Sequence, residues 1–354
     1  GGIGGIAPGE SLEAGTIRRP LNLAESTSAQ WQDWIACAMD IESAYFAEMR
    51  RFLKEDLGVK CPVVGSQVSY GGVYGAIRES EMDYGDMHAY WEHPRFLGKA
   101  WDMKNWRVDN SPMVDVPERS TLLRLAHNRL AGKPYVVSEY NHPAPSSYAS
   151  ECWPMVAGVG AWQDWDGIIV HNYLNYGPGD WQAGRKVGLF DTATNPQKVP
   201  FVLAAAILFR SEALAPAPSC MVQGILKESV PRLLAEGRGK LSDLWQLTGD
   251  NSRQLVRQRL ETRTPPDTGM PDIDEVLKAR NARPETSAIH WQGKRGGQPL
   301  FTVDALNVKV ATGAIAGQTV QLNGASILIE TSETGYATVA LVALAAPGAK
   351  AMGP

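Results

Sequence analysis

Short apolar runs alternate with longer amphipathic segments along the first 215 residues of the chain. The runs are rich in β-branched and aromatic side chains, which predicts strands at residues 61–68, 86–91, 134–142 and 166–173. Elsewhere, apolar positions recur at three- and four-residue steps, which predicts helices at residues 40–57, 117–130, 147–162 and 196–214. Strands that alternate with helices pair in parallel through right-handed crossovers. We therefore expect an α/β fold, and four such units correspond to half of a (β/α)8 barrel.

The pattern changes after Pro216. Residues 300–346 alternate apolar and polar positions with the two-residue period of antiparallel strands. A chain of 354 residues with 44% hydrophobic content can bury one large core and a smaller one. We therefore expect two domains, a partial (β/α) barrel at residues 1–215 and a β-rich accessory domain at residues 216–354. The second domain is expected to have a supporting or glycan-contacting role.

The composition limits the classes of partner. Lys and Arg total 34, Asp and Glu total 38, and the basic residues are scattered, which argues against nucleic acid as a partner. No apolar stretch approaches the roughly 20 residues that span a bilayer, so we expect no membrane segment. The four cysteines lack metal-binding spacing and are expected to be free. The Gly-rich first residues lack a signal-peptide pattern, so we expect the chain to begin after processing, after a tag or inside a longer protein, and the sequence does not assign a localisation.

The expected strands end in side chains that can do chemistry. In parallel α/β barrels the active site lies at the carboxyl ends of the strands, and residues 134–142 carry a lone carboxylate, Glu139, near such an end. From this run alone, Glu139 could equally cap the next helix near Ser146 and Ser147 or pair with an arginine. The other polar and aromatic residues at the strand ends are His88, Tyr90, Trp91, Glu92, His93, Tyr140, Asn141, His142, His171, Asn172, Tyr173 and Asn175.

These strand ends resemble those of the clan A glycoside hydrolases, a (β/α)8 superfamily that includes cellulases, mannanases and β-galactosidases. The matching features are His88-Ala-Tyr90 at the sixth strand, Val137-Ser138-Glu139 at the seventh and aromatic residues at the eighth. The resemblance covers roughly residues 40–214 and implies a partial barrel of strands five to eight. It also implies a retaining glycoside hydrolase for β-linked glycans, without a cofactor.

The resemblance implies roles for individual residues. Glu139 matches the nucleophile that attacks the anomeric carbon, Tyr90 matches the tyrosine that hydrogen-bonds to that carboxylate, and His88 matches a pocket histidine. Tyr90 and His88 could also be ordinary core residues. Eleven tryptophans offer flat faces for sugar rings, although several must lie in the core, as we expect of Trp153 and Trp162. The residues expected to contact the glycan are Trp91, His142, His171, Tyr173 and Trp181.

The chain departs from the family pattern at the second carboxylate. A retaining glycosidase needs an acid/base residue about 5 to 5.5 Å from the nucleophile, and the family places it in an Asn-Glu pair. No Asn-Glu dipeptide occurs in this sequence. The resemblance then implies that the chain lacks the first half of the barrel, or that the acid role has passed to Glu92, Glu81 or Asp86. Of these, Glu92 is expected nearest to the carboxyl ends of the strands.

Other classes of function are weaker matches. A metal-dependent hydrolase could use His88, His93, Glu139 and His171, but the HxH and HExxH patterns are absent. The GxSxG pattern of α/β-hydrolases is absent, and no strand precedes the glycines at the N-terminus that could form a phosphate loop. The main alternative is a non-catalytic carbohydrate-binding or scaffold fragment, which would keep the aromatic cleft and lack the acid.

A half-barrel would expose one apolar face of its sheet. Burying an aliphatic side chain is worth roughly 1.5 to 3 kcal/mol, so an exposed face of this kind favours association. We therefore expect a homo-oligomer, such as a two-fold dimer through the open side of the sheet or its helices. The residues expected on the exposed face are Val63, Val64, Val136, Val137, Ile168 and Ile169.

Overall fold

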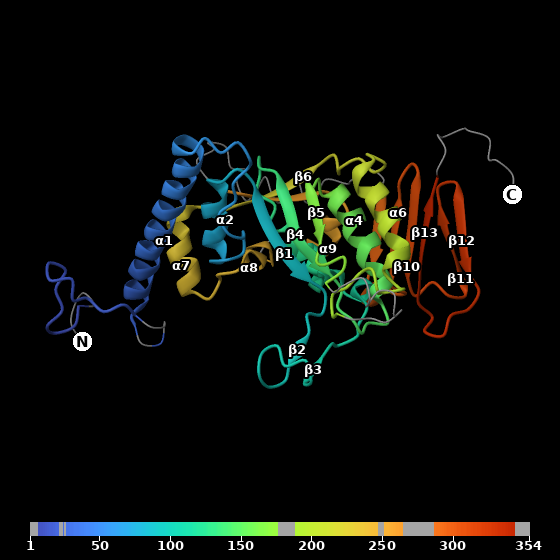
Figure 1. Ribbon diagram of the computed structural model, residues 1–354, viewed down its shortest axis with the longest axis horizontal. Coiled ribbons are helices and arrows are strands. Elements are labelled where there is room, and N and C mark those ends of the chain that lie inside the picture. The colour runs from blue at the N-terminus through green and yellow to red at the C-terminus, as the bar shows by residue number, and fades with distance from the viewer. Residues whose placement is uncertain are drawn as a thin grey trace.

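A parallel sheet of three strands forms the centre of the computed structural model, which describes residues 6–20, 24, 26–175, 188–246, 251–264 and 287–343. The strands are β1 (Gly85–Tyr90), β4 (Tyr135–Asn141) and β5 (Gly167–Val170), in the order β1-β4-β5 (Figure 1). Helices α3 (Thr121–Ala126) and α4 (Cys152–Trp162) make the crossovers between them. The expected α/β sheet is confirmed, whereas the described residues form no closed barrel and the half-barrel stays a proposal.

The first expected strand, at residues 61–68, is not formed. Three of its backbone N–H groups bind side chains instead of a neighbouring strand. Asp83 accepts from the N–H of Val63 at 2.8 Å, and Glu79 accepts from the N–H groups of Gly65 at 3.0 Å and Ser66 at 2.8 Å. The segment still runs beside β1, because the N–H of Val68 donates to the carbonyl of Asp86 at 2.9 Å.

The expected helices are present with different ends. Helix α1 (Ser28–Arg51) starts well before residue 40, because Thr27 and Gln30 cap each other reciprocally. A π-helical turn (Phe52–Asp56) follows it. The helix expected at residues 117–130 is shortened to α3, since Ser120 is extended and caps the N–H of Leu123. Helices α2 (Val73–Ser80) and α6 (Val199–Arg210) complete this part of the chain.

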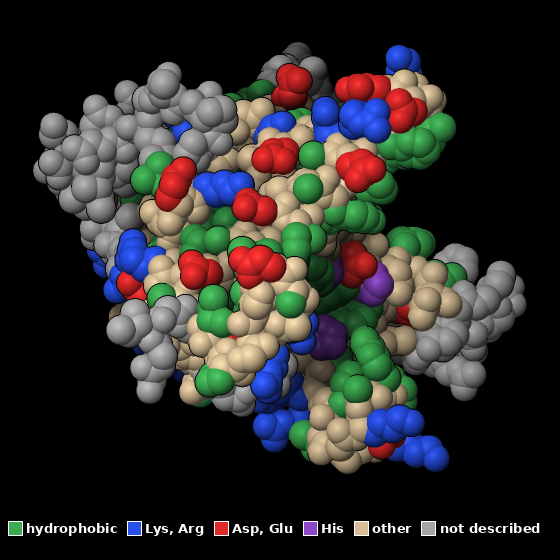
Figure 2. Space-filling model, turned by 90° about the vertical axis from the view of Figure 1, so that its left-hand side faces the viewer, with side chains coloured by type: hydrophobic (Ala, Val, Ile, Leu, Met, Phe, Trp, Pro, Cys, Tyr) green, Lys and Arg blue, Asp and Glu red, His purple; other side chains and the backbone are tan. Residues whose placement is uncertain are grey.

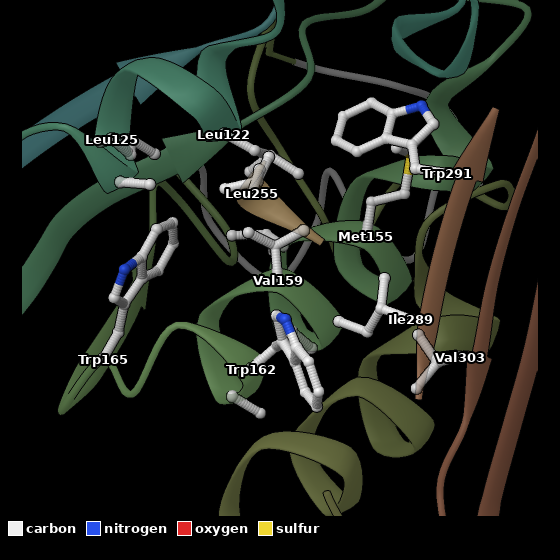
Figure 3. Close-up of a cluster of buried hydrophobic side chains, with 14 of the residues drawn as sticks. Leu122, Leu125, Met155, Val159, Trp162, Trp165, Leu255, Ile289, Trp291 and Val303 are labelled. Carbon is white, nitrogen blue, oxygen red and sulfur yellow. The ribbon is translucent and has the colours of Figure 1, made fainter. Parts of the chain in front are cut away.

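The region after residue 216 begins with a second parallel pair, β6 (Cys220–Gly224) and β7 (Arg259–Arg263). Helices α7 (Val230–Ala235), α8 (Leu241–Gln246) and α9 (Asn251–Leu255) lie between them in the sequence, and α7 packs against α1 (Figure 1). The main core includes residues from both sides of the expected division at residues 215 and 216. Figure 3 shows Leu122, Val159, Leu255, Ile289 and Val303 in this one cluster.

Antiparallel strands form the C-terminal region, as the two-residue alternation predicts. A four-stranded sheet has the order β13-β10-β9-β8, and β11 and β12 form a separate hairpin. Helices α4 and α6 lie between this sheet and the parallel sheet (Figure 1). The strands are β8 (Ile289–Gln292), β9 (Leu300–Asp304), β10 (Val308–Gly313), β11 (Gln318–Leu322), β12 (Ala325–Ile329) and β13 (Ala337–Val342), and a small hairpin earlier in the chain joins β2 (Arg95–Phe96) to β3 (Trp106–Arg107).

The expected apolar face of the parallel sheet is only partly correct. Val137 is fully buried and Ile168 packs against the main core, so both belong to the helix-covered face. Ile169 lies on the opposite face and is 55% exposed, and Val136 is partly exposed. The alternation of side chains along a strand separates these neighbours. None of the helices in the described ranges is long and apolar enough to cross a lipid bilayer.

Candidate functional site

Glu139 and Tyr90 meet at the carboxyl ends of β4 and β1. The Tyr90 hydroxyl donates a hydrogen bond to Oε2 of Glu139, which confirms the contact expected from the sequence. The Glu139 side chain remains 38% exposed, so a ligand can reach the carboxylate. Burial, and then the hydrogen bond and charge of Glu139, raise the pKa of Tyr90, which keeps the phenol protonated and able to donate.

A bulge in β4 gives Glu139 its direction. Val137 pairs with Met87 and Tyr140 pairs with Ala89, so β4 has one more residue than β1 in this interval. The extra residue returns Tyr140 to the buried face that Val137 also occupies. Without the bulge, alternation would direct Glu139 to the same buried face as Val137. The irregularity therefore frees the carboxylate for the open side of the sheet.

Histidine and aromatic rings surround the Tyr90–Glu139 pair. Nδ1 of His171 lies 3.7 Å from Oε2 of Glu139, and the His171 ring is edge-on to Tyr90 with centroids 5.4 Å apart. Phe190 packs on Tyr90 at a centroid distance of 4.7 Å, and His93 lies 5.5 Å from Tyr90. Figure 2 shows a hollow, at the right of the view, with histidine and acidic side chains along it. Sequence reasoning missed Phe190, which follows no expected strand.

Buried polar groups hold this ring cluster in place. The Asn141 side-chain amide donates to the backbone carbonyls of His171 and Phe190. Nζ of Lys198, which is fully buried, donates to Oδ1 of Asn141 at 2.7 Å and to the His142 carbonyl at 3.1 Å. The amide therefore fixes the end of β4 to the two segments that carry His171 and Phe190. Asn141 is two residues after Glu139 at the end of β4, so the strand-end pattern identified it as a candidate. Nothing in the sequence indicates a role for Lys198.

His88 lies on β1 two residues before Tyr90. Its Nδ1 hydrogen-bonds with the side-chain amide of Gln67, and its ring packs edge-on to Tyr70 at a centroid distance of 6.1 Å. The His88 and Tyr90 centroids are 5.9 Å apart. His88 therefore lines the same open region as Tyr90, as the resemblance implies, but the described contacts do not join it to Glu139.

Glu92 is not brought to Glu139. Its Oε1 accepts hydrogen bonds from the backbone N–H and the hydroxyl of Ser111, so the carboxylate is fixed to another loop. Asp86 is buried near the start of β1 and accepts from the N–H of Ser138 at 3.2 Å. Glu81 follows α2 and is in contact with neither Glu139 nor Tyr90. Among the described residues, no hydrogen bond or ion pair links Glu139, Tyr90 or His171 to a second carboxylate.

The expected glycan contacts have different outcomes. His142 is fully buried, with Nε2 bonded to the Tyr140 hydroxyl at 3.0 Å, so the expectation that it contacts substrate is wrong. Nζ of the buried Lys198 donates to the His142 carbonyl at 3.1 Å and so fixes the backbone at this buried strand end. Tyr173 is exposed, and Trp91 packs partly on the core while its indole N–H donates to the Ser111 carbonyl at 2.8 Å. Trp181 lies outside the described residues.

Two further expectations concern tryptophan and metal. Trp153 and Trp162 are buried in the main core behind the sheet, as expected. Within the described residues, no group of three or more His, Cys, Asp or Glu side chains could hold a metal ion. The site is therefore built from one exposed carboxylate, one phenol that donates to it, and histidine and aromatic rings. Comparison with protein-family models, curated proteins and solved structures found no match for this chain.

Proposed function

We propose that the chain is part of a retaining glycoside hydrolase that acts on β-linked glycans, with Glu139 as the nucleophile. The observation that supports this most directly is the Tyr90–Glu139 hydrogen bond at the carboxyl ends of adjacent parallel strands. A carboxylate nucleophile must be ionised, oriented and reachable. The phenol of Tyr90 stabilises the negative charge of Glu139. The Glu139 side chain is partly exposed, so a sugar can reach its carboxylate.

The reaction has two steps. An oxygen of Glu139 attacks the anomeric carbon, and the bond from that carbon to the leaving oxygen breaks with its electron pair going to that oxygen. Water then hydrolyses the glycosyl ester and releases Glu139. A sugar alcohol as leaving group needs a proton from an acid, whereas a nitrophenolate leaves as a stable anion. Because no second carboxylate contacts the described site, activated aryl glycosides should react much faster than natural glycans.

A trapping experiment tests the nucleophile. A dinitrophenyl β-glycoside with fluorine next to the anomeric carbon should release one equivalent of dinitrophenolate and leave its sugar on Glu139. Intact mass and peptide mapping would detect the added sugar. Glu139→Gln should take up no label, because the amide cannot form the ester, and Glu92→Gln should be labelled like the parent. Tyr90→Phe should slow labelling by roughly 10- to 100-fold, the usual effect of one lost charge-assisted hydrogen bond.

The second candidate is a carbohydrate-binding or scaffold role without catalysis. It is favoured by one observation, the separation of Glu92 from Glu139 through its bonds to Ser111. In that case β-linked oligosaccharides would bind to the parent protein and to Glu139→Gln with similar affinity, and no sugar would be attached to Glu139. Labelling of Glu139→Gln at the parental rate would also exclude Glu139 as the nucleophile.

A further inference from the structure

A cavity of about 550 Å³ lies beside β1, and Tyr90 forms part of its wall. His88 and Tyr90 of β1 form one wall. The lining also includes Arg124 of α3, Lys240 just before α8, Tyr70 and Ser242. Because Tyr90 both lines this cavity and donates to Glu139, the cavity adjoins the candidate catalytic site.

The charges in this cavity are of one sign. Its lining includes Arg124 and Lys240 and contains no Asp or Glu among the described residues. Among the described residues, neither side chain forms an ion pair with a carboxylate, although the backbone N–H of Lys240 donates to Oδ2 of Asp243 at 3.1 Å. Surrounding protein lowers the pKa of Arg124, yet a guanidinium keeps its charge in proteins. The described lining of the cavity therefore carries two cationic side chains and no carboxylate.

Two other hollows contain an ion pair between a lining cation and a lining carboxylate. In the hollow at the opposite end of the parallel sheet, Lys54 pairs with Asp83 at 2.7 Å. In the hollow of the C-terminal region, Lys309 pairs with Asp304. Lys60 also lines the first of these hollows, and among the described residues no ion pair joins it to a carboxylate. The cavity beside β1 differs from these two hollows in that no Asp or Glu is among its described lining residues.

The rest of the lining suits a sugar. The Tyr70 ring is 50% exposed and offers a flat apolar face, while the Ser242 hydroxyl can donate or accept hydrogen bonds. Arginine binds planar oxyanions through two parallel hydrogen bonds. We propose that this cavity is a subsite for an anionic group, a carboxylate or a sulfate, on the glycan bound at the Glu139 site. The proposal rests on the proposed function for the identity of the ligand as a glycan.

Binding, rather than turnover, tests the subsite. Calorimetry on the full chain with Glu139→Gln would compare a β-linked oligosaccharide containing glucuronic acid with the same oligosaccharide after its carboxyl groups are reduced. The acidic form should bind at least tenfold more tightly, and the difference should shrink as salt is added. A sulfated oligosaccharide, run in parallel, distinguishes sulfate from carboxylate as the preferred anion.

Substitutions assign the preference to the cavity. Arg124→Gln and Lys240→Gln should each remove most of it, while Arg124→Lys should retain part, because the charge stays and the two-bond geometry is lost. Arg119→Gln is the matched control, since Arg119 is exposed, lies outside the cavity lining and changes the net charge equally. Unchanged melting curves would show that the variants fold.

Equal affinity for the acidic and the reduced oligosaccharide would overturn the subsite, as would a preference that survives in Arg124→Gln with Lys240→Gln, or no binding of either ligand. These results are separable from the trapping experiment. Labelling of Glu139 without a preference for acidic ligands would support the glycosidase and reject the subsite. An Arg124-dependent preference without labelling would reject the nucleophile and retain an anion-selective glycan site.

Discussion

At the scale of single residues, burial changes the chemistry of several ionisable groups away from the site. His127 is buried and stacks on Trp245 with the ring planes 7° apart. Neither ring nitrogen of His127 hydrogen-bonds within the described residues. Burial lowers the pKa of His127 to about 3, and burial also lowers the pKa of His142 well below its usual value. Both rings are therefore neutral in the folded protein near neutral pH.

His127 should make the fold sensitive to acid. Its folded pKa lies below the unfolded value of roughly 6.5, so its contribution to stability is complete above that pH and is lost as the pH falls toward 3. His127→Phe keeps the stack on Trp245 and cannot be protonated. Between pH 7 and pH 5, urea unfolding should show the parent losing about 2 kcal/mol more than this variant. Substituting the exposed His290 by Gln should leave the pH dependence unchanged, and equal losses in parent and His127→Phe would contradict the argument.

At the scale of elements, α4 joins the parallel sheet to the C-terminal sheet. Glycines in the middle of a helix weaken it by roughly 1 kcal/mol relative to alanine, so their presence in α4 needs a packing reason. A Cβ added at Gly158 would lie 2.7 Å from Cγ2 of Val303 and 3.3 Å from Cζ of Phe301. Both contacts come from β9, so the glycine allows the sheet to approach the helix closely.

Gly158→Ala should therefore destabilise the protein despite the better helix propensity of alanine. We expect a loss of about 1 to 3 kcal/mol in the free energy of unfolding, because the core has no room for the methyl group. Val303→Ala is the matched partner. If the clash is the cause, Gly158→Ala should cost less in the Val303→Ala background than in the parent, and strictly additive costs would assign the effect to something other than this contact.

At the scale of the whole molecule, α1 lies at the edge of the structure (Figure 1). An exposed apolar row runs along α1 and into the π-helical turn that follows it. The row consists of Ile41, Tyr45 and Met49 of α1 and Phe52 of the π-helical turn, which recur at helical spacing. Such a surface favours association with a partner or a second copy. The homo-oligomer expected from the sequence stays a proposal, and this row is the surface through which we propose that it forms.

Sedimentation at micromolar concentration tests the assembly. The parent should sediment as a dimer, and Ile41→Glu with Tyr45→Glu should shift it to monomer, because two carboxylates facing their symmetry copies would be buried without partners. Leu203→Glu is the control, since Leu203 is equally accessible on α6. A parent protein that is monomeric and melts cooperatively would refute the dimer and would mean that α1 is stable without a partner.

The sequence by itself determined the features that depend on neighbouring residues. The short apolar runs of β1, β4 and β5 and the alternation in the C-terminal strands are local periodicities, so their element types were predictable. The position of Glu139 and Tyr90 at strand ends follows from the same patterns. Parallel pairing of adjacent strands then brings those ends together, and the resemblance implied the hydrogen bond between the two side chains, whereas the bulge that turns Glu139 to the open face was not predicted.

Only the tertiary structure decided the features that depend on distant residues. Carboxylates of Glu79 and Asp83 take the N–H groups that would have made residues 61–68 a strand. A fully buried Lys198 binds the end of β4 beside His142, which is therefore buried rather than open to substrate. The separation of Glu92 from Glu139 has the same origin, because Ser111 binds it from another loop. Hydrogen-bonding capacity is visible in a sequence, but the choice among competing partners is made when the chain packs.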